Sequence, residues 1–157
     1  MTPETLAQMH AAAFQDTRPW SASEFATLLE SNGVILLGDS QSFLLGRLIV
    51  DEAEVLTLVT PPIFRRQGHA QRCLAAFLDV LAQQQATSVF LEVSDENVAA
   101  KSLYSKYNFH NKEIAQFIWF YLQIYHSCRT HKLSFHSHIH FTTYYSTVTR
   151  KTNNAEV

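Results

Sequence analysis

A short polar turn in this chain carries residue types suited to holding a phosphate group. Between a predicted strand and a predicted long helix lies the run Arg65–Ala70, with the sequence RRQGHA. Such a turn exposes backbone N–H groups at the positive end of the helix dipole, which favours a phosphate or pyrophosphate. Gly68 allows a close approach of the backbone, and Ala70 is small enough to permit it. The alternative is a solvated arginine-rich loop, and the glycine spacing fits neither a Walker loop nor a dinucleotide fingerprint.

Three polar residues downstream of the turn are further candidates for chemistry. Glu92 interrupts an otherwise apolar strand, so it is either a functional carboxylate or an outward-facing surface residue. Tyr104 lies on an apolar helical stripe, where the alternative is a core tyrosine with a hydrogen-bonded hydroxyl. Asn97 stands at the start of a predicted helix, where by default it satisfies local backbone groups.

Helices and strands are predicted upstream of the turn by caps and by apolar runs. Thr2 caps a helix that runs from Pro3 to about residue 14. Ser21 and Glu24 have capping-box spacing, which predicts a second helix over about residues 21–31. Three apolar runs separated by short polar turns predict antiparallel strands at Val34–Leu37, Phe43–Val50 and Ala53–Thr60.

The hydrophobic period changes after the turn. Apolar residues at helical spacing predict a helix over about residues 68–85, and alternation predicts a strand at Ser88–Val93. A further helix, with Ser94 or Asp95 as its cap, is predicted from an apolar stripe made of Ala100, Leu103, Tyr104 and Tyr107. This order over residues 53–107 indicates a βαβ unit after an antiparallel meander, and therefore the α/β class.

The motifs together resemble the GCN5-related N-acetyltransferase (GNAT) superfamily over about residues 1–110. The turn matches the Gln/Arg-x-x-Gly-x-Gly/Ala element of that family. The other matching stretches are Arg18-Pro19-Trp20-Ser21, Asp51–Leu58, Phe90-Leu91-Glu92-Val93, Asn97-Val98-Ala99-Ala100 and Leu103-Tyr104. Within the superfamily the chain is most similar to the ribosomal-protein-alanine N-acetyltransferase subgroup.

The resemblance implies an acyl-CoA N-acyltransferase (GNAT) fold, with a mixed, mostly antiparallel central sheet flanked by helices. Acetyl-CoA, the implied co-substrate, would lie in a splayed gap between the strand ending at Thr60 and the strand 88–93. The implied coenzyme-binding residues are Leu58, Val59, Thr60, Arg66, Gln67, Gly68, His69, Ala70, Gln71 and Asn97. His69 would add charge near the phosphates, or would simply be an exposed turn residue.

The resemblance also implies the chemistry. Glu92 would be the general base and Tyr104 the general acid that protonates or stabilises the departing thiolate. A carboxylate could deprotonate an α-amine, whose pKa is about 7.7–8.0, directly or through water. Cys73 is expected in the core and Cys128 in the tail, which favours direct transfer over an acyl-enzyme.

The favoured acceptor is a protein N-terminal α-amine, and the ribosomal-protein-alanine subgroup suggests a ribosomal protein as its source. A small-molecule amine, a lysine side chain, or coenzyme binding with little catalysis are the alternatives.

Composition limits the number of domains, the partners and the location that the chain can have. A length of 157 residues suits a single N-acetyltransferase domain, and a net charge of −2 argues against a nucleic-acid partner. No apolar run reaches the roughly 20 residues that span a bilayer, and the N-terminus does not resemble a signal peptide. Two cysteines suggest no disulfide framework. We therefore expect a cytoplasmic protein with no membrane association.

The pattern breaks near Glu113. Residues 1–113 hold 8 basic and 13 acidic residues, whereas residues 114–157 hold 4 basic and 1 acidic. Residues 114–143 are interpreted as an atypical insertion or a divergent tail, and a shifted reading frame or unspliced sequence is the alternative. The apolar run 114–124 is strand-prone, and Tyr144–Val157 resembles the family's last strand. His136, His138 and His140 alternate, but no metal is expected, because no fixed carboxylate or Cys completes a ligand set.

Overall fold

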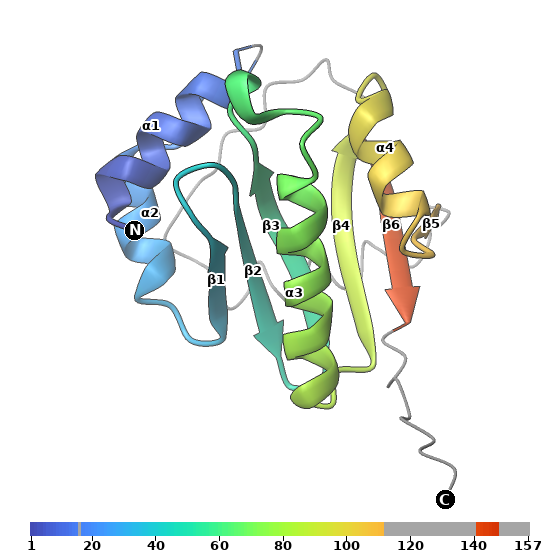
Figure 1. The fold of residues 1–157 in the computed structure, drawn as a ribbon. Coiled ribbons are helices and arrows are strands. Elements are labelled where there is room, and N and C mark those ends of the chain that lie inside the picture. Colours follow the sequence, from blue (N-terminus) through green and yellow to red (C-terminus); the bar gives the residue numbers. More distant parts are fainter. Residues whose placement is uncertain (16, 112–140, 148–157) are drawn as a thin grey trace, which may run out of the picture. The chain divides into compact units, whose positions relative to one another are not determined.

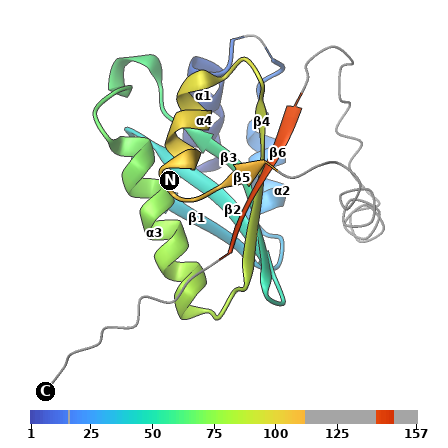
Figure 2. The ribbon, with the colours of Figure 1, turned by 90° about the vertical axis from the view of Figure 1, so that its right-hand side faces the viewer.

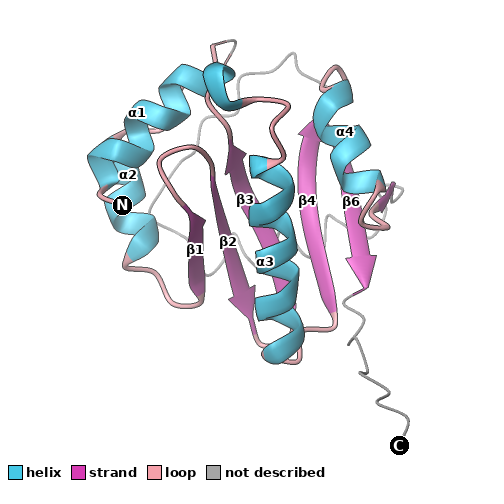
Figure 3. Cartoon of the chain, viewed as in Figure 1, coloured by secondary structure: helices cyan, strands magenta, loops and turns pink. Residues whose placement is uncertain are grey.

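The computed structural model describes residues 1–15, 17–111 and 141–147 (Figure 1). The chain divides into two compact units, one of Met1–Phe90 with Thr147–Val157 and one of Leu91–Ser146. Figure 3 shows the helices and strands of both. The expectations for residues 114–124 and for His136, His138 and His140 lie outside the described residues.

Two capped helices open the first unit. α1 (Pro3–Ala13) begins at Thr2, whose hydroxyl accepts a hydrogen bond from the Thr5 N–H at 3.3 Å. α2 (Ala22–Leu29) has the predicted capping box between Ser21 and Glu24. Arg18 adds a second partner, because its guanidinium lies 2.6 Å from the Glu24 carboxylate and helps to lower the pKa of that carboxyl to about 2. Both predicted helices are confirmed.

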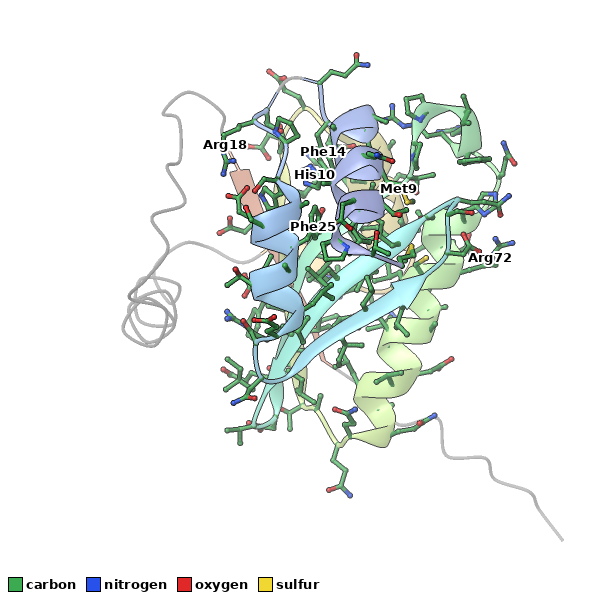
Figure 4. The ribbon with its side chains drawn as sticks, turned by 90° about the vertical axis from the view of Figure 1, so that its left-hand side faces the viewer. Met9, His10, Phe14, Arg18, Phe25 and Arg72 are labelled. Carbon is green, nitrogen blue, oxygen red and sulfur yellow. The ribbon has the colours of Figure 1, made fainter. Side chains whose placement is uncertain are left out.

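An aromatic cluster joins α1 to the chain that leads into α2. It consists of His10, Phe14, Trp20 and Phe25. The imidazole of His10 stacks on Phe14 at 4.4 Å and on Trp20 at 5.2 Å between ring centroids. The Trp20 N–H donates to Nδ1 of His10 at 3.4 Å. Figure 4 shows His10 and Phe25 pointing into the space between the two helices.

An antiparallel meander follows, as the sequence predicted. β1 (Val34–Gly38) pairs with β2 (Phe43–Ile49), and β2 pairs with β3 (Glu52–Val59). The register places Phe43 opposite Gly38 on one side and opposite Val59 on the other. Short polar turns connect the strands, so the register is set locally.

The two faces of the meander carry different helices. Phe43 and Val59 are opposite each other and belong to the core under α1 and α2. Gly46 points to the other face, where the ring of Phe77 from α3 (His69–Gln83) leaves no room for a Cβ. Figures 2 and 4 show α3 on one side of the meander and α1 with α2 on the other.

A bulge in β3 changes the face on which its later residues lie. Leu45 pairs with Thr57, but the next residue, Gly46, pairs with Val55, so Leu56 is the extra residue. Val55 therefore shares the α3 face, whereas Thr57 and Val59 share the face of α1 and α2. The bulge thus sets the direction of the last residues of β3, which the sequence analysis assigned to the coenzyme.

A short connection leads from β3 to α3. It contains the 3-10 helix η1 (Pro62–Phe64), which the sequence analysis did not predict. α3 buries Cys73, Leu74, Phe77 and Leu81 along the predicted apolar stripe. The strand β4 (Ser88–Ser94) begins in the first unit and ends in the second.

The second unit contains the helix α4 (Val98–Ser105) and the strands β5 (His110–Asn111) and β6 (Phe141–Thr147). The cap of α4 is Asn97, whose side chain accepts from the Ala100 N–H at 3.0 Å. The prediction of Ser94 or Asp95 as this cap was wrong, because the extended conformation continues to Ser94 and the helix begins four residues later. β5 and β6 pair antiparallel.

Candidate functional site

The end of β3 is held by side chains from neighbouring segments. The buried hydroxyl of Ser42 donates to the carbonyl of Val59 at 2.8 Å. Because a hydroxyl has one proton, the 2.8 Å contact between Ser42 and Thr60 is a hydrogen bond that Thr60 donates. Arg65 Nε donates to the Thr60 carbonyl at 3.2 Å. Two of the predicted pantetheine contacts, Val59 and Thr60, are therefore fixed in place.

The turn after η1 has a left-handed backbone at two positions. Arg66 has φ 63° and Gly68 has φ 82°. Gly68 is the N-cap of α3 and supplies no side-chain acceptor to the first N–H groups of the helix. A Cβ placed on Gly68 would meet no atom within 4 Å. The turn therefore presents N–H groups of a helix N-terminus beside open space, as an anion site requires.

Arg65 has a structural role beside this turn. One of its guanidinium nitrogens donates to the carbonyl of Ala13 at 2.9 Å, while Nε reaches Thr60. The side chain thus connects the end of β3 with the end of α1. Both arginines of the turn are exposed, and no such bond to another segment is seen for Arg66 among the described residues. This agrees with its assignment to the coenzyme.

His69 is buried, contrary to the expectation of an exposed turn residue. Only 7% of it is exposed. The ring of Phe64 lies edge-on at 6.0 Å, and Arg72 lies 2.6 Å from Nδ1. Phe64 precedes His69 in the chain and Arg72 follows it. The sequence analysis did not predict that both side chains would lie against the imidazole.

A small pocket lies between the turn that joins β1 to β2 and the first turns of α3. Its volume is about 190 Å³, below the roughly 300 Å³ of the smaller common ligand sites. Its lining residues are Gly38, Asp39, Ser42, His69, Arg72, Cys73 and Ala76. Among the predicted coenzyme-binding residues, His69 alone lines it, so this pocket is not a site for the whole coenzyme.

Cys73 is a core residue, as predicted. Its thiol is buried and contacts the Ser42 carbonyl at 3.5 Å. Burial raises the pKa of the thiol, so the reactive thiolate is disfavoured. Cys128 lies outside the described residues.

The predicted catalytic residues belong to the second unit and differ in exposure. Glu92 lies on β4 and is exposed between the buried Leu91 and Val93. Tyr104 lies on α4 with 6% of its surface exposed, and its ring is 5.7 Å from that of Phe109. Burial raises the pKa of Tyr104 to about 12, so its hydroxyl stays protonated at neutral pH. Asn97, a predicted coenzyme residue, caps α4 with its side-chain oxygen.

Two features of the described residues concern the class of site. No group of three or more His, Cys, Asp or Glu side chains that could hold a metal ion is found in this part of the chain. Among the same residues, none of the helices has both the length and the apolar character needed to cross a membrane.

Residues 7–109 match the model of the Acetyltransferase (GNAT) family. The chain belongs to this family. The resemblance indicated by the turn, by Glu92 and by the Leu103-Tyr104 pair is thereby confirmed at the level of the GNAT family.

Curated relatives of this GNAT protein act on a ribosomal protein. The [ribosomal protein bS18]-alanine N-acetyltransferase of Haemophilus ducreyi is 29% identical over 99 residues, which are 59% of this chain and 66% of the relative. The Escherichia coli protein of the same name is 28% identical over 103 residues, which are 61% of this chain and 68% of the relative. The match therefore spans just under two thirds of the first relative's length.

Solved structures show that the fold is that of the GNAT family. The ribosomal-protein-S18-alanine N-acetyltransferase from Escherichia coli matches with a TM-score of 0.71 at 18% identity, over 99% of this chain and 93% of that one. Arabidopsis thaliana NAA60 in complex with acetyl-CoA matches with a TM-score of 0.68 at 14% identity, over 93% of both chains. The predicted GNAT fold is confirmed.

Two residues that support the candidate site were missed from the sequence. Ser42 holds the end of β3 although it precedes Val59 by 17 positions, and no local pattern signals such a contact. Arg72 is a helical neighbour of His69 at i+3, a spacing that brings side chains together on one face of a helix. That spacing was readable in the sequence, because the helix itself was predicted.

Proposed function

We propose that this GNAT protein transfers the acetyl group of acetyl-CoA to the N-terminal α-amine of a protein. The observation that carries the proposal is the turn before α3. Arg66 and Gly68 have left-handed backbone conformations there, and the N-terminus of the helix borders open space. Membership of the GNAT family supports a coenzyme as the ligand of this turn, because proteins of the same fold have been solved in complex with coenzyme A or acetyl-CoA. The pyrophosphate would accept hydrogen bonds from the backbone of residues 66–71.

The reaction needs a base, because an α-amine is largely an ammonium at neutral pH and cannot attack. Glu92 is proposed as that base, since it is an exposed carboxylate on a strand whose neighbouring residues are buried. The proton leaves the amine for Glu92, directly or through a water. The amine nitrogen then bonds to the thioester carbonyl carbon, the carbon–sulfur bond breaks to release a thiolate, and the nitrogen loses its second proton to water to give the neutral amide.

Tyr104 is proposed to stabilise the departing thiolate. Its pKa of about 12 lies well above the value of about 8.5 for a thiol, so complete proton transfer from the phenol would be uphill. A neutral phenol can still donate a strong hydrogen bond to a charged sulfur. The burial of Tyr104 thus favours the stabilising role over that of a full proton donor, the two roles that the sequence left open.

Direct transfer is proposed rather than an acyl-enzyme. Cys73 is buried with a raised pKa, and its thiol faces the Ser42 carbonyl. Kinetics with two varied substrates should therefore show a ternary complex and no ping-pong pattern.

The acceptor is proposed to be a protein whose N-terminus begins with alanine, with a ribosomal protein as the favoured partner. The support is the activity for which the relatives in Haemophilus ducreyi and Escherichia coli are named. A cytoplasmic location stays a prediction of the sequence.

The test compares three acceptors at saturating acetyl-CoA while the release of coenzyme A is followed. One is a peptide with a free N-terminal alanine and no lysine, the second is the same peptide blocked at its N-terminus with one internal lysine, and the third is a small polyamine. We expect turnover of the first acceptor alone. Equal turnover of the lysine peptide or the polyamine would contradict the α-amine assignment. Coenzyme binding without turnover of any acceptor would instead indicate a binding module.

A further inference from the structure

Three side chains at the head of α3 form a chain of hydrogen bonds that leads back into the predicted coenzyme turn. A guanidinium nitrogen of Arg72 lies 2.6 Å from Nδ1 of His69. Nε2 of His69 lies 3.4 Å from Oε1 of Gln67. Nε2 of Gln67 donates to the carbonyl of Ile63 at 3.0 Å. This Arg72–His69–Gln67 relay therefore connects α3 with η1 and encloses the turn.

The direction of every bond in the relay follows from Arg72. A guanidinium can only donate, so Nδ1 of His69 accepts and carries no proton. The ring proton of the neutral imidazole then stands on Nε2 and is donated to Gln67. The amide oxygen of Gln67 is thus an acceptor, and its NH2 group is the donor toward Ile63. A different tautomer of His69 would break the relay at two of its three bonds.

The turn needs such support, because its backbone is costly without it. Arg66 has φ 63°, a left-handed conformation that is unfavourable for an L-residue with a Cβ. Such a conformation persists when its surroundings hold it. The relay spans Arg66 and Gly68, with Ile63 on one side and His69 on the other. Phe64 packs edge-on against the imidazole and limits its movement.

We propose that Arg72 is a positioning residue for coenzyme binding, acting through the Nε2–H form of His69 and through Gln67 on the backbone of the turn. The inference rests on the proposed function of that turn. The side chain and the backbone of Gln67 then have different roles, because the side-chain amide is already hydrogen-bonded to His69 and Ile63 within the turn. Gln67 would then offer its backbone N–H to the pyrophosphate. His69 acts as a neutral link and not as an added positive charge.

Arg72 could instead attract the coenzyme phosphates directly, since it is exposed and positively charged. The two roles differ in what they depend on. If Arg72 is a positioning residue, its effect on binding depends on His69 and persists for any ligand that carries the pyrophosphate. If Arg72 contacts the 3′-phosphate directly, its effect depends on that phosphate and does not depend on His69. The experiment is built on this difference.

Binding of coenzyme A is measured by titration calorimetry in three variants. Arg72→Met removes the donor while keeping a long apolar stem, and Arg72→Lys keeps the charge and one donor. Arg18→Met is the matched control, because it removes the same charge from an exposed arginine whose partner is Glu24. We expect Kd to rise about tenfold in Arg72→Met, to recover partly in Arg72→Lys, and to stay unchanged in Arg18→Met.

The same titrations are repeated with 3′-dephospho-coenzyme A, which retains the pyrophosphate. The penalty of Arg72→Met should persist with this ligand. Its disappearance would overturn the relay in favour of a direct contact with the 3′-phosphate. Arg72→Met, His69→Phe and the double variant then form a cycle, in which we expect the double variant to bind no more weakly than the worse single one. Additive losses would also overturn the proposal.

A readout that needs no coenzyme completes the test. The nitrogen chemical shifts of the His69 ring report which nitrogen carries the proton. The free protein should show Nε2 protonated, and Arg72→Met should show a mixture of tautomers with little loss of thermal stability. An unchanged tautomer in Arg72→Met would overturn the relay. Absence of coenzyme binding in the unmodified protein together with the expected tautomer change would count against the proposed function and not against the relay.

Discussion

The hydroxyl of Ser42 donates a hydrogen bond to the carbonyl of Val59, and this 2.8 Å bond ties the start of β2 to the end of β3. Ser42 is 1% exposed, so the bond is protected from water. The Ser42 hydroxyl oxygen also accepts a hydrogen bond from the hydroxyl of Thr60, the residue that follows the end of β3. The position of the predicted pantetheine contacts thus depends on one buried serine from the neighbouring turn.

Replacement of Ser42 should therefore affect both stability and binding. Ser42→Ala leaves the Val59 carbonyl and the Thr60 hydroxyl without this partner, and we expect a loss of about 1–3 kcal/mol in the free energy of unfolding. Coenzyme affinity should fall several-fold. Urea unfolding and calorimetry measure the two effects, and Ser40→Ala, an exposed serine in the same turn, is the control. Equal stabilities of the two variants would show that the bond contributes little.

Gly68 is expected to be required at the head of α3 for two separable reasons. Its φ of 82° is unfavourable for a β-branched residue, and a Cβ would project into the open space assigned to the pyrophosphate. Gly68→Val should weaken coenzyme binding about tenfold or more and lower stability by roughly 1–2 kcal/mol. Gly68→Asn separates the reasons, because Asn tolerates the left-handed region but still adds a side chain. Full coenzyme affinity in a folded Gly68→Val protein would place the phosphates elsewhere.

Glu92 should affect turnover rather than binding. Glu92→Gln keeps the shape of the side chain but removes its basicity, so kcat/KM for the peptide should fall about 10²-fold with the coenzyme Kd unchanged. Glu96→Gln, a second exposed carboxylate in the same unit, should leave both quantities unaltered. A Glu92→Gln enzyme with nearly full activity across the pH range would remove this residue from the mechanism.

The phenol of Tyr104 should act without ionising in the working pH range. Because burial raises its pKa to about 12, the alkaline limb of the pH–rate profile below about pH 10 should not originate from Tyr104. Tyr104→Phe should lower kcat about ten- to a hundredfold and leave both limbs of the profile in place. A shift of the alkaline limb in this variant would show that the phenol does lose its proton during turnover.

How far the sequence predicted these features depended on the range of the interactions involved. Thr2 and the Ser21–Glu24 box were predicted because a cap acts within three residues of itself. Asn97 was placed at the start of α4 with a bond to local backbone, which is confirmed, but the cap was assigned to Ser94 or Asp95, because the choice among these polar residues depends on how far β4 extends. Local patterns fix elements, but neighbouring elements decide their ends.

The candidate site shows the same limit. The turn at Gly68 was predicted because glycine and helix periodicity are both visible in the chain. The burial of His69 was missed because Phe64 and Arg72 cover it only once η1 and α3 have formed. The contact of Ser42 with Val59 was not predicted, because nothing in the sequence pairs these two residues beyond the adjacency of their strands.

His10 should make the protein lose stability in mild acid. Burial is the main cause that lowers its pKa from 6.5 to about 4, with Glu24 acting in the opposite direction and Arg18 in the same one. Unfolded His10 would therefore bind its proton near pH 6.5, whereas the folded residue stays neutral down to about pH 4. Between these values the unfolded state binds more protons, so stability present above pH 6.5 declines as the pH falls.

The size of this effect follows from the shift, since each pKa unit corresponds to about 1.4 kcal/mol, which gives roughly 3 kcal/mol in total. His10→Phe keeps an aromatic ring against Phe14 and Trp20 but cannot titrate (Figure 4). Urea unfolding between pH 7 and pH 4 should show a smaller loss of stability in His10→Phe than in the unmodified protein. If the free energy of unfolding fell equally with pH in His10→Phe and in the unmodified protein, protonation of His10 would not be the cause of the loss of stability.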